Sequence, residues 1–272
     1  MTTDLYAHVI SKSDFGKNIK WSQVSTDIAL RVNPVPVNTN IALDITDQQL
    51  QSLGMSEEEY VAIRTSEILT ESINEWNPHS SYHITTSIDT TLPSVGSGVN
   101  TFRFSDDRRF FGSGVIGVTT IGYNSDGGEI TSADILLNQS TLAGTVLTLN
   151  KSDSAKTLTF ENSFKRHAYI GDVITHELGH FFGLTHTDTV GASMVFSIFK
   201  GQYSISRDDK AGIEKNYGIN VQNTGLISGK VVAGDDVKEI FGVNVKLFSM
   251  QSNESVSYTH LRAHETDSYL VC

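Results

Sequence analysis

Cysteine is nearly absent from this sequence, whose single example, Cys272, is the last residue. One thiol excludes an internal disulfide framework and any metal site built from several thiolates. Long apolar runs are missing as well, since no stretch approaches the ~18 consecutive apolar residues that a membrane-spanning helix needs. The sequence therefore predicts a chain that folds around an ordinary apolar core and has no membrane span.

Positive charge is also scarce, with 20 Lys and Arg residues against 31 Asp and Glu and a net charge of -11. An acidic surface repels phosphate backbones, so we expect no nucleic-acid partner. Residues 1–16 lack the basic start and apolar run of a signal peptide. Nothing in the composition indicates an oligomeric state.

The predicted elements fall into an α+β pattern, in which strands come first and helices follow, with one long helix inserted early. The long helix should begin after Ser56, because Glu59 completes a capping box. Two more helices are expected at 164–182 and 207–217, and residues 139–163 should be irregular. Strands are expected at 28–32, 41–45, 82–88, 100–104, 115–123 and 129–138.

One segment carries the chemistry, since residues 176–186 match the pattern H-E-x-x-H-x-x-G-x-x-H at every specified position. His176 and His180 lie four apart and so share one face of a helix. Gly183 permits a positive φ and a sharp turn, which can return His186 to the same metal ion. Three neutral imidazoles and one open position are what catalytic zinc requires, and Glu177 can reach a water on the metal. The alternative is a pair of core histidines on a buried helix.

This motif is identified as that of the metzincin metalloproteases, and it is most similar to bacterial proteins of the matrixin branch. Met194 follows His186 by eight residues, as the methionine of a matrixin-like Met-turn does. Residues 206–218 resemble the C-terminal matrixin helix. The resemblance covers about residues 20–218, and it implies a twisted mixed sheet, a long early helix, an active-site helix and a C-terminal helix.

The resemblance implies a secreted, zinc-dependent endopeptidase that hydrolyses peptide bonds of proteins. It assigns the zinc ligands to His176, His180 and His186, and it makes Glu177 the base that activates a water on the zinc. Met194 would pack below the metal. The substrate would lie extended along an edge strand within 115–123. A zinc-binding adhesion or recognition module without turnover is the alternative, and the intact glutamate argues against it.

Some positions depart from the matrixin pattern or allow two interpretations. Thr187 replaces the usual serine, and Phe196 has no hydroxyl to serve as the extra ligand that some metzincins use. The apolar residues at 195, 196, 198 and 199 are expected to form either a substrate pocket or part of the core. Residues 125–129 offer either a Ca²⁺ loop, as in matrixins, or a hairpin turn, and the turn is favoured.

The sequence changes character near its C-terminal end, so we expect a catalytic domain over residues 1–220. Residues 224–256 resemble the start of a carboxypeptidase-regulatory-like β-sandwich module, of which only a part is present. Residues 257–272 resemble a translated sequencing adapter. We therefore expect no metal role for His260 and His264, despite their spacing.

Overall fold

The computed structural model describes residues 10–22, 25–140, 145–153, 166–199 and 201–218, together with the backbone of four later strands. The helices are α1 (Asp47–Leu53), α2 (Glu57–Trp76), η1 (Asn77–His79), η2 (Lys151–Asp153), α3 (Ile170–Phe181) and α4 (Arg207–Tyr217). The strands are β1 (Asp27–Asn33), β2 (Ile41–Ala42), β3 (His83–Ile88), β4 (Thr101–Ser105), β5 (Gly117–Tyr123), β6 (Ile130–Asn138), β7 (Thr145–Thr148), β8 (Arg166–Tyr169), β9 (Leu226–Gly229), β10 (Asn244–Phe248), β11 (Ser255–His260) and β12 (Ser268–Val271).

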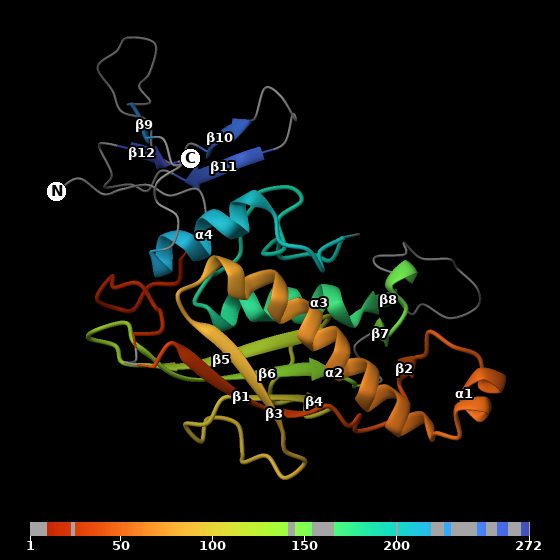
Figure 1. Cartoon of the computed structure of the whole chain (residues 1–272). Helices are drawn as coiled ribbons and strands as arrows, with labels where there is room; N and C mark the ends of the chain where they lie inside the picture. Colours follow the sequence, from red (N-terminus) through yellow and green to blue (C-terminus); the bar gives the residue numbers. More distant parts are fainter. Residues whose placement is uncertain are drawn as a thin grey trace.

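The main sheet has five strands in the order β3-β1-β4-β6-β5. The first four are parallel, whereas β5 runs antiparallel to β6 and forms one edge. Helices α2 and α3 lie side by side across one face of this sheet (Figure 1), and α3 contacts both β5 and β6. The mixed α and β architecture and the mixed sheet agree with the sequence-based prediction, and the order of strands places β5 beside α3.

Helix α2 forms as the sequence predicts. The Ser56 hydroxyl accepts a hydrogen bond from the Glu59 backbone N–H, and the Glu59 carboxylate accepts one in return from the Ser56 N–H. This reciprocal pair satisfies two donors at the start of the helix. The buried stripe of the helix joins the core, whereas Ile63, which lies off the predicted stripe, is 44% exposed.

Three predicted boundaries were wrong. The active-site helix begins at Ile170 and not at residue 164, because residues 166–169 pair with β7 as strand β8. That pairing also gives regular structure to residues 145–148, which were expected to be irregular; residues 154–165 lie outside the described part of the chain. The strand expected over residues 41–45 has two residues, and helix α1 was missed although Thr46 and Gln49 form a capping box.

A segment near the start of the described chain packs beneath the end of α3. The Trp21 indole N–H donates to the Phe181 carbonyl at 2.9 Å. The Asn216 amide donates to the carbonyls of Ile19 and Phe182, both at 3.3 Å, and the Tyr217 hydroxyl donates to the same Phe182 carbonyl at 2.8 Å. Carbonyls that the helix end leaves without partners are therefore satisfied by residues far away in the sequence.

The strands after residue 225 form two antiparallel pairs, β9 with β12 and β10 with β11. Strands β9 and β10 lie within residues 224–256, for which the sequence analysis expected part of a β-sandwich module. The domain boundaries at 224–256 and 257–272 stay predictions. Within the described residues, no helix combines the length and the apolar character needed to cross a membrane.

Candidate metal centre

The structure brings three predicted ligands together at the end of α3. The Nε2 atom of His176 lies 3.1 Å from those of His180 and His186, and the last two are 3.2 Å apart. A tetrahedral zinc ion with bonds of about 2.0–2.1 Å needs nitrogens about 3.3–3.4 Å apart, so the triangle fits such an ion closely. In the described part of the chain, this is the one group of three or more His, Cys, Asp or Glu side chains arranged to hold a metal ion.

Backbone carbonyls fix how two of these rings point. The His176 Nδ1–H donates to the Ser193 carbonyl at 2.6 Å, and the His180 Nδ1–H donates to the Leu184 carbonyl at 2.8 Å. A carbonyl only accepts, so the proton lies on Nδ1 and each Nε2 keeps its lone pair for a metal. Burial lowers the pKa of His176 to about 3 and that of His186 to about 4, so both rings are neutral near pH 7.

Gly183 makes the turn that returns the third ligand. Its φ is +81°, in the left-handed region that favours glycine, and its N–H donates to the His180 carbonyl at 2.7 Å. A Cβ atom at this position would overlap the Ile19 carbonyl oxygen. Position 183 therefore needs glycine both for its backbone angle and for the close passage of the N-terminal segment.

The Glu177 carboxyl lies between α3 and the edge strand β5. The side chain is buried, and the Thr119 hydroxyl donates to its Oε2 at 2.7 Å. Burial raises the pKa of Glu177 to about 7, and the hydrogen bond from Thr119 opposes this rise. A Cβ atom on Gly117 would stand 2.6 Å from Val173 Cγ1 and 2.7 Å from Glu177 Oε1. The strand can approach the carboxyl only because residue 117 is glycine.

Sequence reasoning missed Gly117 and Thr119. Their spacing places them on the same face of a strand, and that was the one available signal. What the sequence does not show is that this face meets Glu177, which lies 58 residues beyond Thr119.

Met194 is buried and packs against Gly179 of α3, the residue before His180. Its carbonyl accepts a hydrogen bond from the Thr187 N–H at 2.9 Å. The Asp209 carboxylate in turn accepts N–H groups from Ser193 at 2.7 Å and from Met194 at 3.1 Å. The turn that carries the methionine is therefore held to α4 by one buried carboxylate.

A second buried carboxyl, Asp208, lies next to Asp209 on α4 and is 1% exposed. Its Oδ1 atom has no hydrogen-bond partner. Burial first, and the charge of Asp209 second, raise the pKa of Asp208 from 3.8 to about 7. The folded state thus holds a proton on Asp208 that the unfolded chain releases near pH 4.

We expect Asp208→Asn to stabilise the fold above neutral pH. Because the folded pKa is raised, the contribution of Asp208 to stability is complete below about pH 4 and is lost as the pH rises towards 7. Asparagine has no such pH-dependent loss, so the variant should gain up to about 4 kcal/mol of stability relative to wild type between pH 4 and pH 8. Urea unfolding of both proteins across this range measures the gain, and parallel pH curves would contradict it.

The apolar residues after Met194 differ in burial, and a substrate pocket formed by them stays a prediction. Ile198 packs against the core, whereas Phe196 is 80% exposed and meets the His186 ring edge-on, with ring centroids 5.1 Å apart. Phe196 is therefore a surface residue beside the candidate metal site.

The turn at residues 124–128 joins β5 to β6, with the Gly128 N–H donating to the Asn124 carbonyl at 2.7 Å. This is the hairpin turn that the sequence favoured there, and the alternative of a Ca²⁺ loop stays a prediction.

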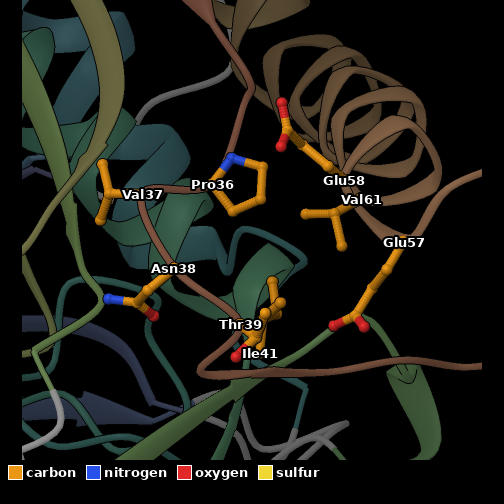
Figure 2. Close-up of a pocket in the computed structure, with 8 residues that line it drawn as sticks. All are labelled: Pro36, Val37, Asn38, Thr39, Ile41, Glu57, Glu58 and Val61. Carbon is orange, nitrogen blue, oxygen red and sulfur yellow. The ribbon is translucent and has the colours of Figure 1, made fainter.

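A pocket of about 140 Å³ lies elsewhere, between the loop at residues 36–41 and the start of α2 (Figure 2). It is lined by Pro36, Val37, Asn38, Thr39, Ile41, Glu57, Glu58 and Val61. None of these residues belongs to the histidine site, so the chemistry described above takes place outside this pocket.

The described site contains a histidine triangle, a buried glutamate and a methionine turn. The sequence profile of the matrixin family matches residues 120–218. This match includes all three histidines, Glu177, Met194 and helix α4, and it supports a metzincin-like metalloprotease domain that binds zinc and acts on proteins. A search of curated proteins found no match.

Proposed function

We propose that this chain is a zinc-dependent endopeptidase in which Glu177 is the general base. The observation that carries the proposal is the convergence of three Nε2 atoms within 3.2 Å of one another, with Glu177 next to the first of them on α3. His176, His180 and His186 would hold the zinc ion. When bound, zinc polarises a carbonyl group and lowers the pKa of water to about 7.

The protein's own residues prepare the proton transfers. The Thr119 hydroxyl occupies Oε2 of Glu177, which leaves Oε1, beside Gly117, to take a proton from the attacking water. Glu177 then passes that proton to the leaving amine. The raised pKa of Glu177, about 7, suits a group that must both accept and donate a proton near neutral pH.

The position of β5 supports an extended substrate. β5 is an edge strand whose residues are half-buried or exposed, and among the described strands only β6 pairs with it. A peptide that adds to such an edge gains backbone hydrogen bonds and needs little sequence selectivity for them. Because Glu177 contacts the same strand, a peptide bound there would pass close to the carboxylate.

The test is cleavage of an unfolded protein by the full chain, with and without a zinc chelator. We expect chelation to lower the rate at least about 100-fold and added zinc to restore it, because the metal and the base act together. A His186→Ala preparation purified in the same way controls for contaminating proteases. Cleavage that survives chelation, or that persists in the His186→Ala preparation, would refute the proposal.

Thr119→Val should lower kcat/KM about 10-fold while leaving the zinc content unchanged. Valine keeps the branched shape but removes the donor to the Glu177 carboxylate, and a hydrogen bond to a charged group contributes about 1.5–3 kcal/mol. Thr120→Val is the matched control, since successive strand residues point to opposite faces. Steady-state cleavage rates measure the effect, and equal losses in the two variants would argue against a role for the hydroxyl.

A further inference from the structure

The Gln202 side chain forms hydrogen bonds with both ends of the segment that follows Met194. Its side chain is 2% exposed, and its amide nitrogen donates to the carbonyls of Ser193 at 2.7 Å and Val195 at 3.2 Å. Its amide oxygen accepts the Phe199 N–H at 3.3 Å. One side chain therefore uses both of its N–H groups and its oxygen to hold the ends of the segment from Val195 to Phe199.

The Ser193 carbonyl also belongs to the metal centre. It accepts the His176 Nδ1–H at 2.6 Å, so the first candidate zinc ligand and Gln202 share one oxygen. The Ser193 hydroxyl in turn donates to the backbone carbonyl of Gln202 at 2.9 Å, so each of the two residues donates a hydrogen bond to the other. A carbonyl oxygen has two lone pairs, and the two donors from His176 and Gln202 use both lone pairs of the Ser193 carbonyl.

The segment that this amide holds also contacts His186, the third candidate ligand. That segment carries Phe196, whose exposed ring rests on the His186 ring. Gln202 is thus linked to His176 by hydrogen bonds to the shared Ser193 carbonyl. It is linked to His186 through the segment that carries Phe196, whose ring contacts the His186 ring. Mutation of a group that hydrogen-bonds to a metal ligand and orients it typically costs about 10-fold to 100-fold in metal affinity or activity.

We propose that Gln202 is a positioning residue that sets the orientation of His176 and, with it, the affinity for zinc. It acts through the Ser193 carbonyl and couples that orientation to the segment from Val195 to Phe199. The inference rests on the proposed zinc peptidase function and adds a residue outside the histidine motif to its metal site.

The test compares Gln202→Met with a matched variant, Gln139→Met. Gln139 is equally buried, and its amide likewise accepts a backbone N–H, from Val37 at 2.7 Å, and donates to a carbonyl, that of Asn38 at 3.3 Å. These partners line the pocket of Figure 2, which contains none of the zinc-site residues. Both variants lose a buried amide, but only one of them loses a partner of the metal centre.

We expect Gln202→Met to weaken zinc binding about 10-fold, measured by competition with a chromogenic chelator, while Gln139→Met retains wild-type affinity. The visible spectrum of bound Co²⁺ should change in the first variant only. Should Gln202→Met fail to fold, Gln202→Glu keeps the acceptor for Phe199 and is compared with Gln139→Glu.

The outcomes distinguish failure of the role of Gln202 from failure of the proposed function. Wild-type zinc affinity and an unchanged Co²⁺ spectrum in the Gln202 variant would overturn the inference, and so would equal losses in both variants. If the wild-type chain binds zinc and cleaves protein in these same experiments, the proposed function survives either result. A wild-type chain that binds no zinc overturns both.

Discussion

Replacing Glu177 with glutamine is expected to lower kcat about 1,000-fold while one zinc ion stays bound per chain. Glutamine has the same shape, and its amide oxygen can still accept the Thr119 hydroxyl. What it lacks is a basic oxygen that can take a proton from water and return it to the leaving amine. The Nδ1–H groups of His176 and His180 donate to the backbone carbonyls of Ser193 and Leu184 and not to Glu177, so metal binding should persist. Single-turnover cleavage and metal analysis of the same sample measure both quantities.

This variant also separates an enzyme from a binding module. If the chain only recognises proteins through its zinc site, Glu177→Gln should bind zinc and protein as the wild type does, and the wild type should show no cleavage. Retention of more than about a tenth of wild-type kcat would mean that another group is the base, since general base catalysis contributes about 100-fold to 10,000-fold.

Gly183→Ala should destabilise the fold by at least about 3 kcal/mol and lower the zinc content. Alanine at a φ of +81° is strained by about 1–3 kcal/mol, and its Cβ would overlap the Ile19 carbonyl oxygen. Relief of the overlap must move either the N-terminal segment or the turn that carries His186. Urea unfolding and the metal content of the purified variant report these two effects.

Gly191→Ala is the matched control for this prediction. Gly191 has a φ of +89° and lies in the loop between His186 and Met194, but no atom lies within 4 Å of an added Cβ. It should therefore show the backbone strain alone, about 1–3 kcal/mol, with full zinc content. Equal destabilisation and equal metal content in the two variants would show that the contact with Ile19 contributes nothing.

The convergence of the three histidines could be predicted largely because it depends on local structure. His176 and His180 share a helix face through the helical repeat, and Gly183 supplies the turn that brings His186 back within a few residues. Helix α2 was predictable for the same reason, since its capping box and its apolar stripe lie within one segment.

Features that depend on distant partners could not be predicted. Strands β7 and β8 are stable because they pair with each other. Strand β8 includes residues 166–169, which the sequence pattern had assigned to the start of a helix. Thr119 and Gln202 reach the site only after the sheet and the later loop have folded around α3. Their residue types are common on any surface, so sequence alone gives no reason to single them out.

The side chains that close the end of α3 imply an order of events in folding. Trp21 and Phe181 are 160 residues apart, and Asn216 is 197 residues from Ile19, yet their hydrogen bonds surround the turn before His186. Contacts between such distant residues form late, because a large loop must close before they contribute. During synthesis the chain emerges from its N-terminus, so Ile19 must wait for Asn216 to leave the ribosome. The third histidine should therefore reach its final position late, and a nascent chain would acquire peptidase activity only when its catalytic fold is nearly complete.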